Sequence, residues 1–559
     1  MTSRFYTITP LLLVSLLFLL AVRPPEEVPD LNMAEAVASV DTIFERWDHP
    51  DRPGCAVGIA REGQVLLTRA YGMADLEHSV PLSPSTIFEA GSVSKQFAAA
   101  AIILLELDGK LSLDDDVRTY VPEVPDYGEP VALRHLITHT SGLRDWGSVA
   151  AISGWGRSSR THNHEHVLDI ISQQRELNFA PGTRYSYSNS GYNLLAVVVE
   201  RVSGTSFAEF STEHIFKPLG MTDTQWRDNY RRIVPRRSSA YTAVNDSTFT
   251  INRPIENVHG NGGLLTTVQD LLVWNQALTD GRLGGQPFVE AMHRTGTLAN
   301  GRGIAYGMGL QHQTRLGLPV IQHTGATSGY RAYLSRFPEQ KLSVAMLCNT
   351  TNVNIGGMGS RVAEIFLGPH VRDDAEAPRA AIEVTPETLN AKVGRYQDPL
   401  TGSATTLVVD DGELRIDGGS RLMPRSTSTF AVGSGSRQFV FEETTDAQRP
   451  TIRVLVDGHE DGVLEPVDTF DPSVDALEAF TGTFYSADAE TEVSLTVQDG
   501  ELVVQRRPRA IFPATPVYTD AFRTNMGLLR FERNESGDVI GFRLSRSRVY
   551  GMPFERVAR

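Results

Sequence analysis

Two residues in the first fifth of the chain, Ser92 and Lys95, have the types and the spacing for proton transfer. The chain holds 52 lysines and arginines, of which only five are lysine. Arginine keeps its proton in proteins, whereas a buried lysine can give one up. Ser92 precedes Lys95 by three residues in a stretch expected to be helical, so the two side chains share a face. The pairing therefore indicates proton transfer between Ser92 and Lys95.

The residues that follow Lys95 support this interpretation. The stretch 92–107 is apolar on nearly every side, which predicts a buried helix. Burial disfavours the charged form of lysine and brings its pKa toward a value useful for a base. The start of a helix also places the backbone N–H of Ser92 where an oxyanion is stabilised. The alternative is a helix-capping serine followed by a solvated lysine, which gives the lysine no partner.

Tyr187 and Asn189 form a second polar pair, just before an apolar helix expected at 194–199. A tyrosine whose hydroxyl faced the Lys95 ammonium would lose its proton more easily, so Tyr187 is a candidate general base. Asn189 could accept a hydrogen bond from Lys95 and donate one to a substrate carbonyl. Taken alone, this segment also fits an aromatic-rich loop with a helix-capping asparagine.

A third polar group, His323-Thr324-Gly325-Ala326, ends an expected strand. A glycine there would let the backbone of a ligand lie close against an edge strand. The N–H of Ala326 could then join that of Ser92 as a second oxyanion donor. For His323 alone, a structural histidine with satisfied hydrogen bonds is the favoured interpretation.

The three motifs Ser-x-x-Lys, Tyr-x-Asn and His-Thr-Gly, in this order, resemble the serine β-lactamase and penicillin-binding-protein superfamily. Within it they are similar to the branch of class C β-lactamases, D-Ala-D-Ala carboxypeptidases and D-aminopeptidases (peptidase family S12). The resemblance covers roughly residues 35–370, and the segments 136–143 and 262–270 are also familiar in that family.

The resemblance implies an α+β fold in which a helical lobe packs on a five-stranded antiparallel sheet, with the cleft between them. It also implies roles for the residues of the three motifs. Ser92 would be the nucleophile, Lys95 its activating partner and Tyr187 the base. Substrate would be bound by Asn189, His323, Thr324 and Gly325, and the oxyanion by the N–H groups of Ser92 and Ala326.

Two departures from the family pattern narrow the activity. His323 stands where efficient β-lactamases have lysine, and its weaker charge disfavours binding of a penicillin carboxylate. Tyr-x-Asn in place of Ser-Asp-Asn indicates the class C type. We therefore expect a serine hydrolase that acts through an acyl-enzyme on small peptides, amides or esters. A β-lactamase, or a penicillin-binding sensor that is acylated without turnover, is the alternative.

Composition and the first residues bear on partners and location. The net charge of −15 argues against nucleic acid as a partner. The apolar run 11–22 follows Arg4 and is shorter than a membrane-spanning helix. It predicts a secretory signal, and an uncleaved membrane anchor is the alternative because the cleavage pattern is poor. We expect an exported protein, periplasmic or secreted, with self-association left open.

The chain contains two cysteines, Cys55 and Cys348. Two thiols buried in core strands are the favoured interpretation. In the fold that the resemblance implies, the strands holding them are neighbours, so a disulfide is the competing hypothesis.

Changes in sequence texture divide the chain into five parts. A leader and linker (1–30) precede the catalytic domain (31–372), and a charged linker (373–386) leads to two β-rich lobes (387–470 and 471–559). The lobes repeat: Gly394 and Gly482, and likewise Asp411-Gly412 and Asp499-Gly500, are 88 residues apart. About eight short strands in each copy predict two barrel-like lobes, which would shape the cleft or mediate assembly.

Other kinds of site find less support. Three histidines at 162, 164 and 166 invite a zinc site, but we interpret them as an exposed, incidental cluster. No Gly-x-Ser-x-Gly occurs, which excludes the nucleophile elbow of α/β-hydrolases. We therefore expect no metal and no cofactor, and a small molecule or peptide as substrate.

Overall fold

A seven-stranded antiparallel sheet is the centre of the catalytic domain in the computed structural model, which describes residues 32–371, 382–433, 435–442 and 449–558. The strand order is β10-β11-β12-β13-β14-β1-β2. Five neighbouring strands match the five-stranded sheet that the resemblance implies: β12 (Leu318–Thr327), β13 (Tyr330–Phe337), β14 (Leu342–Cys348), β1 (Cys55–Arg61) and β2 (Gln64–Tyr71). The sheet is wider than the resemblance implied, because β10 (Tyr306–Gly307) and β11 (Leu310–Arg315) extend it beyond β12.

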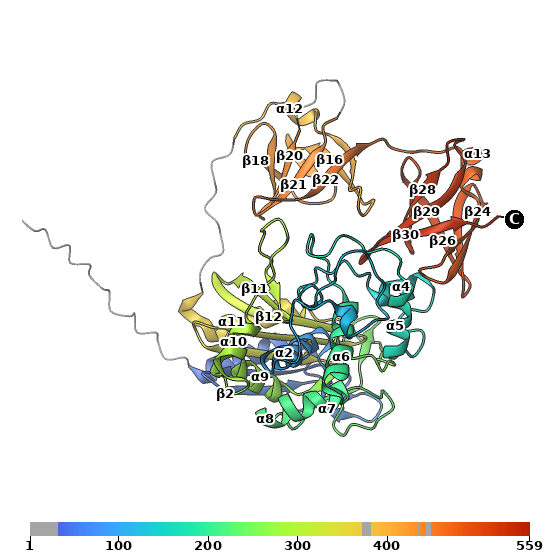
Figure 1. Cartoon of the computed structure of the whole chain (residues 1–559). Coiled ribbons are helices and arrows are strands. Elements are labelled where there is room, and N and C mark those ends of the chain that lie inside the picture. Colours follow the sequence, from blue (N-terminus) through green and yellow to red (C-terminus); the bar gives the residue numbers. More distant parts are fainter. Residues whose placement is uncertain (1–31, 372–381, 434, 443–448, 559) are drawn as a thin grey trace, which may run out of the picture.

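Helices cover both faces of this sheet (Figure 1). Alternate residues of β1 point to opposite faces, as in any strand. Cys55, Val57 and Ile59 belong to a core shared with α1 (Met33–Phe44) and α11 (Ile355–Leu367). The residues between them are small: a Cβ on Gly58 would lie 3.0 Å from a Leu272 methyl, so the glycine allows α9 (Val268–Asp280) to approach closely.

The second face carries the helical lobe. Its central helix is α2 (Lys95–Leu107), and the side chains from Lys95 to Ile103 are all buried, which confirms the predicted all-round burial. α6 (Asn189–Ser203) packs beside it. The other helices of the lobe are α3 (Leu133–Ile137), α4 (Trp146–Ile152), α5 (His164–Ser172), α7 (Phe207–Ser211), α8 (Lys217–Leu219) and α10 (Gly285–Met292).

Short strand pairs complete the domain. β3 (Met73–Asp75) pairs with β4 (Val80–Pro81), and β7 (Tyr241–Ala243) with β8 (Phe249–Ile251). β9 (Leu264–Thr266) lies between β5 (Phe88–Glu89) and β6 (Gln225–Trp226). This last sheet fixes the chain directly before Ser92, because the N–H of Ala90 donates to the carbonyl of Leu264.

The register of the large sheet decides the state of the two cysteines. Cys55 of β1 lies opposite Cys348 of β14, and the two sulfurs form a disulfide. The favoured interpretation of two buried thiols is therefore wrong, and the competing hypothesis is confirmed. Spacing along the chain could not decide between them, because the pairing depends on the register of strands from opposite ends of the domain.

Two β lobes follow the catalytic domain, each with eight strands as the repeat predicts (Figure 1). The two Asp-Gly pairs form equivalent hairpin turns, with positive φ at Asp411 (49°), Gly412 (76°), Asp499 (50°) and Gly500 (82°). The first lobe contains α12 (Pro386–Asn390) and β15 to β22: Gly394–Gln397, Ala404–Asp410, Glu413–Ile416, Leu422–Pro424, Thr429–Val432, Arg437–Phe441, Ile452–Val456 and His459–Val467.

The second lobe closes into a barrel and packs against the catalytic domain. Val149 and Ile152 of α4 join its apolar core. Its elements are α13 (Val474–Leu477) and β23 to β30: Gly482–Ser486, Thr491–Gln498, Glu501–Arg506, Ala510–Tyr518, Ala521–Thr524, Gly527–Arg533, Val539–Arg546 and Val549–Arg556.

The expected leader (1–30) lies outside the described residues, and so does most of the expected linker 373–386. Within the described part of the chain, no helix is both long and apolar enough to span a membrane.

Candidate active site

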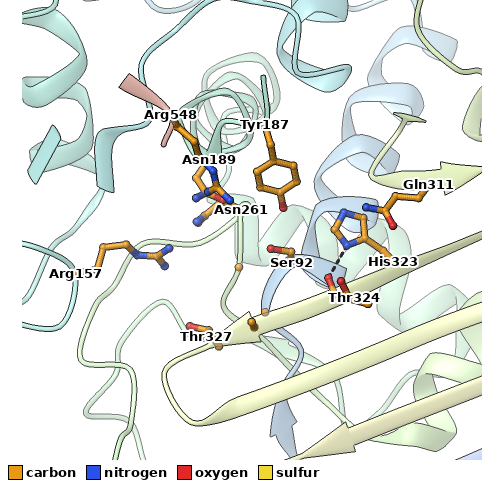
Figure 2. Close-up of a pocket in the computed structure, with 13 residues that line it drawn as sticks. Ser92, Arg157, Tyr187, Asn189, Asn261, Gln311, His323, Thr324, Thr327 and Arg548 are labelled. Atoms are coloured by element: carbon orange, nitrogen blue, oxygen red, sulfur yellow. Dashed lines mark hydrogen bonds between the residues drawn. The ribbon is translucent and has the colours of Figure 1, made fainter. Parts of the chain in front are cut away.

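The predicted residues meet at one cavity of about 340 Å³ (Figure 2). Lys95 is fully buried and directly adjoins it. The described residues that line the cavity are Gly91, Ser92, Arg157, Tyr187, Asn189, Asn261, Gly262, Gln311, His323, Thr324, Ala326, Thr327 and Arg548. Every residue of the three sequence motifs except Lys95 and Gly325 is thus exposed to the same small space.

Ser92 lies in a short 3₁₀ turn (Gly91–Ser94) that leads directly into α2. This turn approaches the end of β12, which pairs with β11 only up to residue 322 and so leaves residues 323–327 as an edge on that side. The contact is tight, since a Cβ on Gly91 would lie 2.7 Å from the Ala326 nitrogen. Ser92 and Ala326 therefore face the cavity together, as a shared oxyanion site requires.

Three oxygen atoms surround the Lys95 amine. Nζ lies 2.9 Å from Oδ1 of Asn189 and 2.7 Å from the carbonyl oxygen of Asn261. Ser92 Oγ is 3.4 Å away. A neutral amine has two hydrogens and one lone pair, and the two amide oxygens take the hydrogens. The lone pair is then left for the hydroxyl of Ser92, which is the arrangement that a base needs.

Burial holds the pKa of Lys95 well below its ordinary value, and the positive charges of Arg157 and Arg548 lower it further. Asp145 acts in the opposite direction. The neutral amine that the mechanism needs is therefore favoured by the surroundings of Lys95, as the apolar sequence of its helix predicts.

Tyr187 is positioned differently from the sequence-based expectation. Nζ of Lys95 lies over the ring face, 4.8 Å from its centroid. The hydroxyl points toward Ser92 (Figure 2). Burial raises the pKa of Tyr187, which outweighs the opposing effect of its hydrogen bond with Ser92. The expected lowering of the Tyr187 pKa by a facing ammonium is therefore wrong, and the neutral phenol is favoured.

Asn189 begins α6, and Asp145 fixes the direction of its amide. Oδ2 of Asp145 accepts from the backbone N–H of Asn189 at 2.8 Å and from its Nδ2 at 2.9 Å. Oδ1 of Asn189 must then face Lys95, as predicted. One amide hydrogen remains for a substrate carbonyl.

His323 is buried and neutral. Nδ1 lies 2.6 Å from the carbonyl oxygen of Thr324, and Nε2 lies 3.2 Å from the hydroxyl of Tyr306. Burial, reinforced by Lys95, lowers the pKa of His323 to about 4. At neutral pH His323 therefore carries no charge with which to hold a carboxylate.

A glycine is required at position 325 for a different reason from the expected one. A Cβ there would lie 2.0 Å from the carbonyl oxygen of Ala90, so the glycine allows β12 to approach the chain before Ser92. The close neighbour is this protein's own backbone rather than a ligand. Thr324, beside it, faces the cavity.

Sequence reasoning missed several residues of this site. Asn261 directly precedes the segment 262–270, which is familiar in the family. Its place beside that segment is the feature of the sequence that could have indicated a role in the site. Asp145 shows no such signal. Arg157 is held by Glu256 and lies over the ring of Trp146, 5.3 Å from its centroid. Arg548 comes from the second β lobe, and no sequence pattern connects it with Ser92.

The three histidines of segment 161–166 are not exposed as expected. His162 is buried, with Nε2 3.0 Å from the carbonyl oxygen of Trp155. The ring nitrogens of His164 and His166 accept backbone N–H groups of His259 and Asn163. The histidines thus have structural partners, and among the described residues no group of three His, Cys, Asp or Glu is placed to hold a metal ion.

Comparison with known proteins adds independent information. A model of the β-lactamase family matches residues 40–358. Penicillin-binding protein 4* of Bacillus subtilis is 28% identical over 448 residues, which cover 76% of this chain and 97% of that protein. A D-aminopeptidase of Gluconobacter oxydans is 32% identical over 323 residues, which cover 57% of this chain and 59% of that relative.

Two solved structures share the fold. The octameric penicillin-binding protein homologue from Pyrococcus abyssi aligns with a TM-score of 0.53 and 22% identity, covering 86% of this chain and 98% of its own. The D-amino acid amidase from Ochrobactrum anthropi aligns with a TM-score of 0.50 and 21% identity, covering 60% of this chain and 99% of its own. The range matched by the family contains all three motifs, whereas Arg548 lies outside it.

Proposed function

The chain belongs to the β-lactamase family of serine hydrolases, and we propose that it cleaves small peptides, amides or esters through a covalent acyl-enzyme. The observation that carries this proposal is the Lys95 amine, buried and desolvated, 3.4 Å from the Ser92 hydroxyl. Amide and peptide substrates are supported by relatives described as D-aminopeptidases and by the similar fold of a D-amino acid amidase.

In the first half of the reaction, Oγ of Ser92 attacks the substrate carbonyl while its proton passes to Nζ of Lys95. The N–H groups of Ser92 and Ala326 stabilise the oxyanion, each contributing on the order of 10²–10³ in rate. Tyr187, a neutral phenol beside Ser92, donates a proton to the departing nitrogen and is reprotonated from Lys95. Water then attacks the ester of Ser92, the acid leaves, and the serine recovers its proton.

Intact mass spectrometry tests this proposal. A fluorophosphonate should add one equivalent to the wild-type protein and none to a Ser92→Ala variant. Wild type should then release product continuously from at least one amide in a panel of D- and L-amino-acid amides. Failure of Ser92 to react would contradict the proposal.

The same assays separate the alternatives. One equivalent of product followed by silence would indicate a sensor, and preferential turnover of penicillins would indicate a β-lactamase. The neutral state of His323 disfavours preferential turnover of penicillins, because His323 then provides no positive charge to bind the penicillin carboxylate.

We also propose that the protein is exported, through a cleaved leader or a retained membrane anchor. The apolar run 11–22 and the disulfide Cys55–Cys348 support export, since structural disulfides persist mainly in oxidising compartments. Cell fractionation and the mass of the mature N-terminus test it. Self-association is a further proposal, suggested by the octameric homologue and tested by sedimentation.

A further inference from the structure

A residue from the far end of the chain reaches the cavity around Ser92. Arg548 lies in the turn between β29 and β30 of the second β lobe, and it lines the cavity together with Arg157. Figure 2 shows both arginines on the side of Ser92 opposite His323 and Gln311. The cavity is therefore incomplete without the C-terminal barrel.

The catalytic domain fixes the backbone of this turn from several directions. The carbonyl oxygen of Arg548 accepts from the N–H of Asp145 at 3.2 Å and from Nδ2 of Asn178 at 3.0 Å. Oδ1 of Asn178 accepts from the N–H of Tyr550 at 2.8 Å. Such bonds on both sides of the turn hold Arg548 at the cavity rather than leaving it on a free loop.

The guanidinium of Arg548 is available to a ligand. It lies over the face of Tyr187, 4.6 Å from the ring centroid, and Nη1 is 3.7 Å from Oδ2 of Asp145, beyond hydrogen-bond distance. That carboxylate oxygen already accepts two bonds from Asn189. The side chain of Arg548 is 37% exposed and lines the cavity, so its guanidinium can donate N–H bonds to a ligand there.

Charge around the cavity is unbalanced. Arg157 and Arg548 both line the cavity; Arg157 pairs with Glu256, and Nη1 of Arg548 lies 3.7 Å from Oδ2 of Asp145. None of the described residues that line the cavity is Asp or Glu. A free amine would meet only like charge there.

We propose that Arg548 binds a free carboxylate of the substrate, so that the C-terminal barrel makes the enzyme selective for anionic peptides or amides. This inference rests on the proposed function and specifies its substrate class. A guanidinium binds a carboxylate through two parallel N–H···O bonds. Loss of a hydrogen bond to a charged group weakens binding about 10- to 100-fold.

Calorimetric titration of the Ser92→Ala protein tests the inference without chemistry. Two matched pairs of probes place the carboxylate on either side of the amide. They are N-acetyl-D-Ala-D-Ala against its carboxamide, and N-succinyl-D-alaninamide against N-acetyl-D-alaninamide. The carboxylate member of at least one pair should bind about 10- to 100-fold more tightly. Arg548→Gln should abolish that preference, whereas Arg546→Gln, in the same hairpin but outside the cavity, should retain it.

Three results would overturn the inference: no preference in either pair, a preference that survives Arg548→Gln, or tighter binding of D-alaninamide with its free amine. The fluorophosphonate assay separates this failure from failure of the proposed function. If Ser92 is acylated but neither probe pair shows a carboxylate preference, the protein is still a serine hydrolase. Only the role proposed for Arg548 is then contradicted.

Discussion

Replacing Asp488 by alanine should undock the barrel that carries Arg548. Asp488 accepts from Nη1 of Arg144 at 2.5 Å, and the two side chains are 1% and 0% exposed. Removing the carboxylate leaves a buried guanidinium without its main partner. We expect the free energy of unfolding to fall by about 3–5 kcal/mol. Because Arg144 directly precedes Asp145, which bonds to the Arg548 backbone, carboxylate selectivity should fall with it.

Asp461→Ala is a matched control. Asp461 pairs with Arg302 between the catalytic domain and the first lobe, but its side chain is 30% exposed. Solvent screens this pair, so its loss should cost no more than about 1 kcal/mol. The assay is urea denaturation of each variant beside wild type. An Asp488→Ala protein as stable as Asp461→Ala would refute the reasoning. The double replacement Arg144→Met with Asp488→Leu removes both charges, so it should recover most of the lost free energy of unfolding.

Three further predictions concern the disulfide, the base and the phenol. Replacing both Cys55 and Cys348 by alanine should lower the free energy of unfolding by about 4–5 kcal/mol, because the disulfide spans 293 residues; unchanged urea denaturation would contradict this. Arg548→Gln removes a charge that lowers the pKa of Lys95, so that pKa rises and the acid limb of the acylation rate moves to higher pH. An unmoved limb would show that the amine is not the titrating base. Tyr187→Phe should keep the ring over Lys95 but reduce kcat for amides by about 10²–10⁴, and a wild-type kcat would remove the hydroxyl from the mechanism.

The local sequence was sufficient to predict those structural features that depend on residues near one another in the chain. The apolar residues after Lys95 predict both the burial of α2 and the lowered pKa of the amine. The repeat that contains the two Asp-Gly pairs predicts two lobes of about eight strands each. Each of these features is determined by residues close together in sequence, for which spacing and residue type are direct evidence.

Long-range contacts could not be predicted in the same way. The state of Cys55 depends on the register between β1 and β14. Arg548 reaches the cavity because a barrel near the other end of the chain packs on α4 and its turn accepts hydrogen bonds from Asp145 and Asn178. The direction of the Tyr187 pKa shift depends on how deeply the assembled site buries its hydroxyl. Residue types at these positions do not specify which distant segment will lie beside them.

The rate at which a fluorophosphonate labels Ser92 in a Lys95→Arg protein tests the central claim most directly. Arginine keeps its proton in proteins and so cannot accept the serine proton. The account predicts that labelling and amide hydrolysis fall by at least about 10² relative to wild type while the protein remains folded. Wild-type labelling in the arginine variant would contradict the claim that a neutral lysine activates the nucleophile.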